Sequence, residues 1–413
     1  NPQTALLILA SFDSKDALQM DIAREYLSRL DKKVLEQDGK LGKMEEILRK
    51  GFQYPLVELG CLLVPKYEKI KKDDFQGDFD VIEKISFGDG KIHLRENRAT
   101  GMDLYQANQG DLITSKINVH QGAMALSPCD LVCSTHYQVY LINPEVNPKY
   151  LLLILRSSKF LEIVNIEKAG GIKNEAGVEF LAKFKIPLPS LEAQNEIVGK
   201  IEKQKQIIEG AERIEEGFTV DQFLESHHQE EFIGKLAQVD GSPVKDLDAL
   251  MNETYVGGEN IESGTGRLLN LQTVQKAGII GPSFAFKKDH VVYSKVRPNL
   301  QKCFYADFDG VCSSDIYPLK VNGDLILGKY LAMVLQTKLF AKKTESFQEG
   351  RSGMPKINQD QLAQIKIPLP PLETQRQIVE KLNRQMQALE GVRLLKSEAE
   401  KRIEEILVKV WGE

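Results

Sequence analysis

Two hydrophobic patterns alternate along the chain, and each predicts a different kind of structure. In residues 371–413 apolar side chains recur every three or four positions, as in a helix with one narrow apolar face. Residues 190–238 carry the same spacing at Ile197, Ile201 and Ile208. A helix with so narrow an apolar face is not stable alone in water, so each of these two segments is expected to need a partner.

Residues 52–189 and 239–370 show instead short extended runs separated by glycine-rich turns. The run at residues 291–296, for example, fits a half-buried strand. Neither segment has the strand–helix–strand alternation of a doubly wound sheet. Both are therefore predicted to be domains of mixed strands and helices.

The stretch at residues 186–198 is written a second time at residues 367–379, and both copies begin Ile-Pro-Leu-Pro-x-Leu-Glu-x-Gln. Each copy changes from an extended run to a helix, with proline at the helix start and glutamate in its first turn, where both are favoured. Three further pairs of segments match in the same order: residues 111–118 with 289–297, 131–135 with 310–314, and 149–152 with 329–332. Over the last two of these pairs and the repeated motif, the offset between the copies drifts only from 179 to 181 residues. The chain is therefore interpreted as a tandem duplication.

The predicted fold class is α+β, with two tandem-duplicated domains of mixed strands and helices separated by two long helices. The domains are placed at residues 52–189 and 239–370, and the long helices at residues 190–238 and 371–413. Because both helices leave equivalent positions of duplicated domains, they are expected to pair as an antiparallel coiled coil. Residues 1–51 are predicted to be an N-terminal helical segment, with the alternative that they form a hairpin packed on the neighbouring domain.

Composition places the chain among soluble globular proteins of two or three domains. It has 413 residues, of which 42% are hydrophobic and 27% charged, and no apolar run reaches the roughly 20 residues of a membrane span. The apolar start is too short for a signal peptide, and five cysteines, an odd number, favour reduced thiols and a cytoplasmic setting.

The formal net charge of −5 does not exclude a nucleic-acid partner. Residues 190–238 contain 11 acidic and 5 basic side chains, so they carry a net charge of −6 and the rest of the chain carries +1. The acidity belongs to one predicted helix. This distribution of charge gives no support to DNA binding either.

Candidate binding residues lie on two pairs of loops. In the first pair, basic and amide side chains end a strand, which suits phosphates or base edges: Lys116, Asn118 and His120 in the first domain, and Lys295, Arg297 and Asn299 in the second. In the second pair, glycines allow close backbone approach: Lys173 and Asn174 in the first domain, and Arg351 and Ser352, followed by Lys356, in the second. Arg267 is a further candidate on a polar loop. Solvated turns remain the alternative for these loops.

Known catalytic signatures are absent from the sequence, and one metal-binding combination is incomplete. No adenine-methylation signature, Gly-x-Gly-x-x-Gly turn or Walker motif occurs. Cys129, Cys133 and His136 could belong to a metal site, but a fourth ligand is not evident. We interpret the cysteines as small core residues. No catalytic residue, metal site or cofactor site is predicted in this chain.

Two mixed domains that each end in Ile-Pro-Leu-Pro-x-Leu-Glu-x-Gln and a long helix resemble the DNA specificity (S) subunit of type I restriction–modification enzymes. The resemblance covers the chain from about Tyr54 to its end, and residues 255–261 are similar to the family's segment near the start of a target-recognition domain. It implies two target-recognition domains that each read one half of a split DNA sequence. The paired helices then set the spacing and dock methyltransferase (M) subunits.

The same resemblance implies the partners: double-stranded DNA, two M subunits and restriction (R) subunits, with no membrane. S-adenosylmethionine, ATP and Mg are then bound by the partner subunits, and this chain is non-catalytic. Two alternatives stay open, a scaffold whose duplicated domains bind only protein and a recognition chain of another methyltransferase type. The target bases and the spacer length depend on loop geometry and DNA shape, which the sequence does not give.

Overall fold

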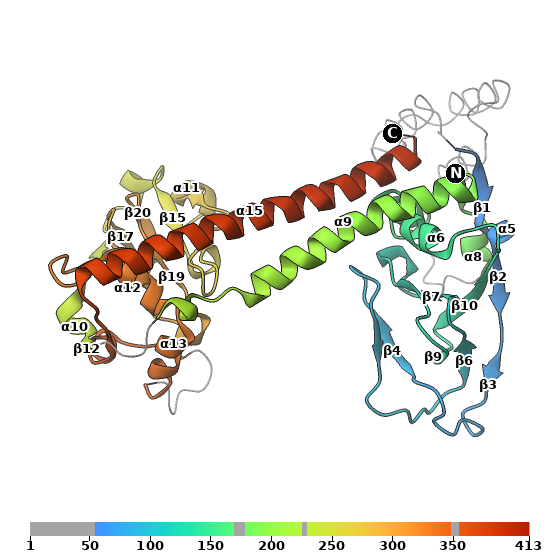
Figure 1. Cartoon of the computed structure of the whole chain (residues 1–413), viewed down its shortest axis with the longest axis horizontal. Helices are drawn as coiled ribbons and strands as arrows, with labels where there is room; N and C mark the ends of the chain where they lie inside the picture. Colours follow the sequence, from blue (N-terminus) through green and yellow to red (C-terminus); the bar gives the residue numbers. More distant parts are fainter. Residues whose placement is uncertain (1–53, 169–177, 225–228, 348–354, 413) are drawn as a thin grey trace. The chain divides into compact units, whose positions relative to one another are not determined.

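The computed structural model describes residues 54–168, 178–224, 229–347 and 355–412 (Figure 1). The described chain divides into two compact units. The first contains the residues up to Gly210 and those from Leu395 onward, and the second contains residues 211–394. The helical segment predicted at residues 1–51 lies outside the described residues. None of the helices described is both long and apolar enough to cross a membrane.

The first unit holds a four-stranded antiparallel sheet in the order β2-β10-β7-β8, a three-stranded sheet β3-β6-β9, and the two-stranded pairs β1-β11 and β4-β5. Its elements are β1 (Leu56–Glu58), α5 (Leu59–Leu62), β2 (Leu63–Lys66), β3 (Lys69–Ile70), β4 (Ile82–Ile85), β5 (Ile92–Leu94), β6 (Leu104–Ala107), β7 (Leu112–Ser115), η1 (Val119–Gln121), β8 (Met124–Leu126), β9 (Leu131–Ser134), β10 (Tyr137–Ile142), α6 (Pro148–Leu155), α7 (Ser158–Lys168), α8 (Val178–Ala182), β11 (Lys185–Pro187) and α9 (Leu191–Gly217).

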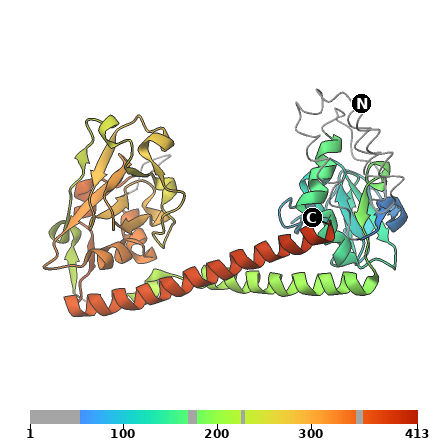
Figure 2. The ribbon, with the colours of Figure 1, turned by 90° about the horizontal axis from the view of Figure 1, so that it is seen from above.

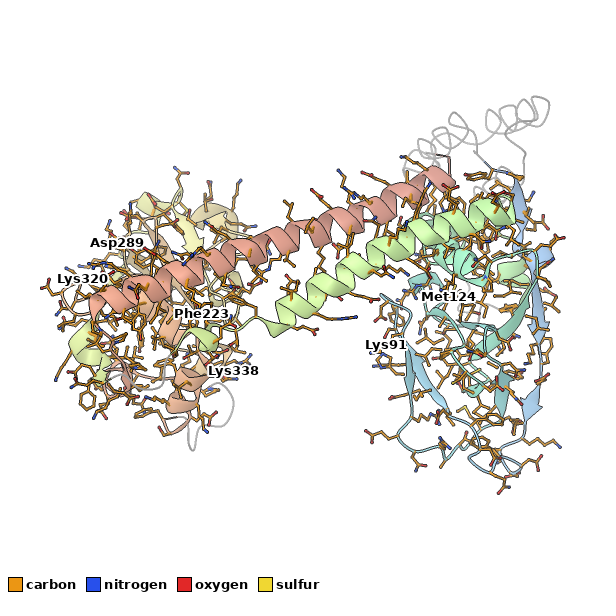
Figure 3. The ribbon with its side chains drawn as sticks, in the orientation of Figure 1. Lys91, Met124, Phe223, Asp289, Lys320 and Lys338 are labelled. Carbon is orange, nitrogen blue, oxygen red and sulfur yellow. The ribbon has the colours of Figure 1, made fainter. Side chains whose placement is uncertain are left out.

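The four-stranded sheet of this unit is buried on both faces, which explains its nearly continuous apolar strands. Leu112 of β7 packs against α6 and α7, in one core with Met124 (Figure 3). The next residue, Ile113, points to the opposite face and packs with β4 and β9 in a second core. Asn147 begins α6 by accepting hydrogen bonds from the backbone N–H groups of Lys149 and Tyr150.

The second unit repeats this arrangement. It has a four-stranded sheet β13-β21-β18-β19, a five-stranded sheet β14-β17-β20-β15-β16, and the pair β12-β22. Its elements are η2 (Val220–Phe223), β12 (Glu230–Phe232), α10 (Ile233–Leu236), β13 (Ala237–Val239), β14 (Ser242–Pro243), η3 (Asp248–Leu250), β15 (Thr254–Val256), η4 (Gly258–Asn260), β16 (Gln272–Thr273), α11 (Val274–Ala277), β17 (Ser283–Phe286), β18 (Val291–Ser294), η5 (Pro298–Leu300), β19 (Cys303–Tyr305), β20 (Gly310–Ser313), β21 (Ile316–Val321), α12 (Gly328–Leu335), α13 (Lys338–Glu345), α14 (Gln359–Ala363), β22 (Lys366–Pro368) and α15 (Leu372–Val410).

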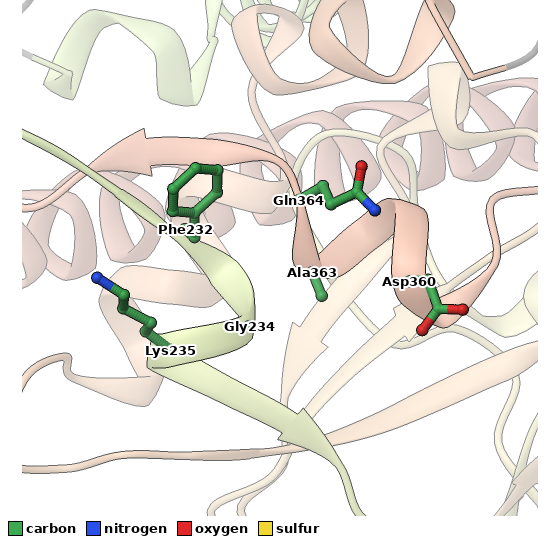
Figure 4. A pocket seen from close by; sticks show the side chains of 6 residues that line it. All are labelled: Phe232, Gly234, Lys235, Asp360, Ala363 and Gln364. Carbon is green, nitrogen blue, oxygen red and sulfur yellow. The ribbon is translucent and has the colours of Figure 1, made fainter.

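The equal strand orders of the two four-stranded sheets confirm the duplication and the α+β class. Even the closest helix contacts recur. A Cβ atom on Gly234 of α10 would lie 2.9 Å from Cβ of Ala363 in α14, and one on Gly60 of α5 would lie 3.2 Å from Cβ of Ala182 in α8. In each domain, glycine therefore lets one short helix approach the other closely, α10 to α14 and α5 to α8. Beside the contact of Gly234 with Ala363, the residues Phe232, Lys235, Asp360 and Gln364 help to line a shallow pocket of about 550 Å³ (Figure 4), to which we assign no chemistry.

The glutamine of the repeated motif fastens each domain to its long helix. Gln194 is 1% and Gln375 0% exposed, although both are polar. The amide oxygen of Gln375 accepts a hydrogen bond from the backbone N–H of Leu327, just before α12, at 2.8 Å, and its amide nitrogen donates to the carbonyl of Pro370 at 2.8 Å. Gln194 makes the same two bonds, from the Asn147 N–H at 2.8 Å and to the Pro189 carbonyl at 2.9 Å. In both copies the motif's glutamine therefore connects the start of the long helix to the domain before it, and we call this connection the joint.

Replacing Gln375 by leucine is expected to lower the free energy of unfolding by about 1–3 kcal/mol, because a backbone N–H and a carbonyl then lose their buried partner. Urea unfolding of the full chain measures the change. Gln377→Leu is the matched control, since Gln377 is exposed two residues further along the same helix. Equal effects of the two substitutions would contradict the stabilising role of the Gln375 hydrogen bonds.

The first long helix is shorter than predicted. α9 ends at Gly217, whereas residues 190–238 were predicted to be helical throughout. The chain then turns into η2, where Val220 and Phe223 enter the core of the second unit (Figure 3). The carboxylate of Asp221 accepts hydrogen bonds from the backbone N–H groups of Lys338 and Leu339, at the start of α13. These contacts hold the turn, so the apolar residues after Gly217 belong to the domain and not to the helix.

The long helices pair in antiparallel sense, as predicted. Figure 2 shows the two helices running in opposite directions. In the first unit, Ile197 and Ile201 near the start of α9 share a core with Leu407 and Val410 at the end of α15. In the second unit, the last turn of α9 meets the middle of α15, where the Arg393 guanidinium donates to the Glu215 carboxylate. The start of one helix thus lies against the end of the other.

Candidate nucleic-acid interface

The loop between β18 and η5 brings together the predicted residues Lys295, Arg297 and Asn299 in the second domain. Arg297 adopts a left-handed backbone, with φ of 50° and ψ of 61°, and so does Gln301 at the far end of η5. Such a conformation costs a non-glycine residue about 1–2 kcal/mol, so surrounding contacts must hold it. Arg297 and Asn299 are exposed. Within the part of the chain that the structure describes, the Arg297 guanidinium forms no ion pair.

Backbone bonds to residues 355–357 hold this loop in place. The Arg297 N–H donates to the Pro355 carbonyl at 2.8 Å, and the Ile357 N–H donates to the Lys295 carbonyl at 3.0 Å. Lys356 pairs with Val296 between these two bonds. The loop is therefore fixed before any ligand arrives, while its polar side chains face solvent.

The two lysines at this end of the domain have defined surroundings. The Lys295 ammonium lies 5.0 Å from the centre of the Tyr317 ring, within the range of a cation–π contact. The Lys356 ammonium lies 2.9 Å from the Asp315 carboxylate. Since Asp315 also bonds the Lys295 N–H through its carbonyl, the turn between β20 and β21 joins both lysines. Lys295, Arg297 and Lys356 therefore lie at one end of the domain.

The equivalent loop of the first domain lies between β7 and η1. The Lys116 ammonium donates to the Thr135 carbonyl at 2.8 Å and lies 5.5 Å from the centre of the Tyr105 ring. The Asn118 N–H donates to the Ser115 hydroxyl at 3.1 Å, and the His120 carbonyl accepts from the Asn165 amide at 3.1 Å. Lys116 and Lys295 thus occupy equivalent positions, each over a tyrosine ring.

Arg267, the remaining candidate among the described residues, is not part of these two loops. Arg267 lies 3.3 Å from the Glu390 carboxylate on α15, so the structure gives it an ion pair with the long helix, and its assignment to DNA stays a prediction. Lys173, Asn174, Arg351 and Ser352 lie outside the described residues.

Cys133 is a core residue as predicted, but Cys129, which was interpreted in the same way, is exposed. Cys133 in β9 and Cys312 in β20 are buried at equivalent positions, and burial raises the pKa of each thiol to about 12. Both thiols therefore stay protonated near neutral pH, a poor state for a metal ligand. Among residues 54–168, 178–224, 229–347 and 355–412, no three His, Cys, Asp or Glu side chains are grouped as metal ligands.

Sequence reasoning missed the two tyrosines beneath the lysines. Tyr105 lies in β6 and Tyr317 in β21, so they are not equivalent positions of the duplication. Nothing in the sequence separates them from tyrosines of the core such as Tyr293. Only the pairing of strands brings each ring under its lysine.

Comparison with known proteins gives one family. The type I restriction modification DNA specificity domain matches residues 66–216 and again residues 258–398. The EcoDI specificity subunit of Escherichia coli is 35% identical over 131 residues, which are 32% of this chain and 29% of that subunit. The putative MjaX specificity subunit of Methanocaldococcus jannaschii is 25% identical over 376 residues, which are 82% of this chain and 87% of that subunit.

Two solved structures have the same fold. A chain from a study of complex assembly and conformational transition of the type I R-M system is 18% identical, with a TM-score of 0.53, over 87% of this chain and 97% of that one. The S subunit of a type I restriction–modification system from M. genitalium is 15% identical, with a TM-score of 0.50, over 87% of this chain and 96% of that one.

Proposed function

This chain belongs to the family of type I restriction–modification DNA specificity domains, and on that premise we propose that it is the non-catalytic subunit that selects the DNA sequence for its complex. Each of the two domains reads one half of a bipartite target in the cytoplasm. The observation that carries this proposal is the duplication of the lysine-bearing loop: Lys116 and Lys295 directly follow equivalent strands of two equivalent sheets.

The chemistry of the second loop suits a DNA duplex. Arginine donates two parallel hydrogen bonds to guanine O6 and N7 in the major groove, and Arg297 offers an exposed guanidinium on a fixed loop. Lysines that contact phosphates position the protein without reading bases. We therefore assign base reading to Arg297 and phosphate contact to Lys116, Lys295 and Lys356.

The long helices serve as the spacer and as the docking surface for M subunits. α15 has 39 residues. At 1.5 Å per residue such a helix is about 60 Å long, enough to hold two readers one duplex turn, roughly 34 Å, apart. α9 exposes Ile207 and Ile214, 41% and 54% accessible, and α15 exposes Leu394 and Leu395, 62% and 56% accessible. Exposed apolar side chains on otherwise polar helices suit a protein partner.

In the assembled complex two M subunits dock on these helices, and R subunits join them. S-adenosylmethionine is held by the M subunits, and ATP with Mg by the R subunits. This chain then contributes sequence choice alone, and double-stranded DNA is its ligand.

The test is to assemble the chain with the M subunits of its own system and select bound duplexes from a random pool. We expect a bipartite sequence with a fixed gap. If about six phosphates are contacted, affinity falls about 10³-fold between 50 and 200 mM salt. A stable complex with M subunits that selects no DNA sequence would favour the protein scaffold instead.

The same assay tests the assigned base reader. Arg297→Ala is expected to weaken binding by about 1–3 kcal/mol, roughly 5- to 150-fold, and to relax base choice at one position of one half-site. Arg376→Ala is the matched control, because Arg376 is an exposed arginine of α15 that pairs with Glu373 in its own helix. Uniform weakening on every sequence would reassign Arg297 to a phosphate.

A further inference from the structure

Arg393, in the middle of α15, binds three carboxylates from three different segments. Its guanidinium donates to Glu215 in the last turn of α9 at 2.9 Å, to Glu390 one turn earlier in α15 at 2.8 Å, and to Glu262 of the second recognition domain at 2.8 Å. The Arg393 side chain is only 15% exposed. All four residues belong to the second unit.

Hydrogen bonds and a buried neighbour hold the loop of the recognition domain that carries Glu262. Glu262 lies in a closed loop, because Ile261 pairs with Leu268 and the Glu262 N–H donates to the Arg267 carbonyl at 2.9 Å. The Glu262 carboxylate also accepts a hydrogen bond from the Thr265 hydroxyl. Ile261 is 1% exposed and belongs to the domain core. Glu262 is therefore connected directly to the core of the second domain through its neighbour Ile261.

A second ion pair joins the same loop to the same helix. Arg267 lies 3.3 Å from Glu390, which itself binds Arg393. Two guanidinium groups and three carboxylates therefore alternate along this contact. Burial lowers the pKa of Arg393, but its hydrogen bonds to Glu215, Glu390 and Glu262 outweigh this effect and the net pKa is raised. Arg393 stays charged, and without it the carboxylates would repel one another.

The first domain contacts the long helices through a mainly apolar core, beside the hydrogen bonds of Gln194 and an ion pair between Lys149 and Glu202. There Trp411, just after α15, is 4% exposed in the main core, and its indole N–H donates to the Ser157 hydroxyl at 3.1 Å. Apolar contacts of this kind tolerate small rotations, whereas the planar fork of an arginine binds carboxylates in fixed directions. The arginine that binds three carboxylates at the contact between domain and helices lies in the second unit.

We propose that Arg393 is a positioning residue that fixes the angle of the second recognition domain on the helical spacer and so narrows the range of half-site spacings that the chain accepts. This rests on the proposed function, because spacing has meaning only if each domain reads one half-site. Glu262 carries the link to the domain, and Glu215 carries the link between the two helices.

The first experiment uses the complex with M subunits and duplexes in which the two half-sites are separated by the preferred gap, one base pair fewer and one more. Wild type is expected to reject the altered gaps. In Arg393→Gln and in Glu262→Gln this discrimination should fall about tenfold, with base choice inside each half-site unchanged. Glu215→Gln should have a smaller effect, and the control Arg376→Gln none.

Wild-type behaviour tests the proposed function, since a chain that selects no bipartite sequence would overturn that proposal. An unchanged spacing profile in both Arg393→Gln and Glu262→Gln would overturn the positioning role alone. Weaker binding at every spacing, with the ratio between spacings preserved, would also overturn it, because loss of stability gives that result.

A second measurement needs no DNA. Spin labels are placed at Ile280→Cys, a domain residue 95% exposed, and at Gln387→Cys, an exposed position of α15, after the exposed Cys61 and Cys129 are changed to serine. Pulsed electron paramagnetic resonance then reports the distribution of distances between them. Arg393→Gln and Glu262→Gln should broaden it, and Arg376→Gln should not. A distribution of unchanged width in Arg393→Gln would overturn the proposal.

Discussion

Replacing residues 230–368 by the equivalent segment of another specificity subunit is expected to change the bases of one half-site and leave the other half-site unchanged. The segment begins at β12 and ends at β22, and because these strands pair through Glu231 and Ile367, both cuts fall at the same edge of the domain. A cut at Gly241 would instead separate β13 from its partner β21. Specific sites are bound typically 10³- to 10⁷-fold more tightly than other DNA, so preference for the exchanged half-site should fall about 10³-fold or more.

The exchange must preserve the joint to α15. Leu327 lies inside the segment and donates to Gln375 outside it, and Glu262 inside the segment binds Arg393 outside it. The incoming segment therefore needs a backbone N–H and a carboxylate at the equivalent places. Methylation mapping in a host that carries the intact system reads both half-sites at once. The reciprocal exchange of residues 56–187 is the control and should change only the other half-site. A change in both half-sites after either exchange would contradict independent reading.

The architecture could be predicted because duplication turns weak local signals into a pair of signals. A single Ile-Pro-Leu-Pro stretch is an ordinary strand end. Two of them at matching offsets predict two domains and two helices, and the equal sheet orders confirm this. The reason for the motif's glutamine was hidden, since its partners, Asn147 and Leu327, lie far away in sequence.

Other equivalent positions could not be predicted, because the two copies keep the same strand pairing but carry different side chains. Tyr255 pairs in parallel with Val311, and Val81 pairs in the same way with Val132, so the first domain does contain a counterpart of the segment at residues 255–261. Its sequence has diverged too far to match.

The acidic and basic members of one side-chain pair have exchanged places between the two copies. The buried Lys66 ammonium lies 3.1 Å from the Asp111 carboxylate. At the equivalent place Asp240 supplies the carboxylate and His290 the base, 3.7 Å apart. Burial lowers the pKa of His290, against the opposing effect of Asp240. Each residue alone resembles a surface charge, and only the strand pairing shows that they form a pair.

The candidate interface was predicted in part for the same reason. Loops at strand ends can be recognised in the sequence, so the positions of Lys116 and Lys295 after equivalent strands could be predicted. Arg393 could not, because it lies among the polar positions of a long helix and its partner Glu262 is remote in sequence. Helical spacing predicts which residues face away from the coiled-coil partner. It does not predict that a domain covers one of them.

Adding seven residues to each long helix is expected to lengthen the gap between the half-sites and to leave both half-site sequences unchanged. The insertions belong between Ile201 and Ala211 in α9 and between Arg393 and Leu407 in α15, so that the contacts at both ends stay intact. Seven residues keep the apolar faces in register and add about 10 Å at 1.5 Å per residue. That length corresponds to about three base pairs at 3.4 Å each.

The preferred gap should grow by about one to three base pairs, because each added pair also turns the duplex by about a tenth of a turn and the readers must still face their grooves. Selection from duplexes with fixed half-sites and random gap lengths measures the change. Insertion into α9 alone is the control. It breaks the register of the paired helices, so it should weaken binding at every gap without creating a new optimum. Because Gln194 and Gln375 fix each domain to its helix outside the inserted stretch, base choice has no physical reason to change. Altered half-site bases after the double insertion would show that α9 and α15 do more than separate the readers.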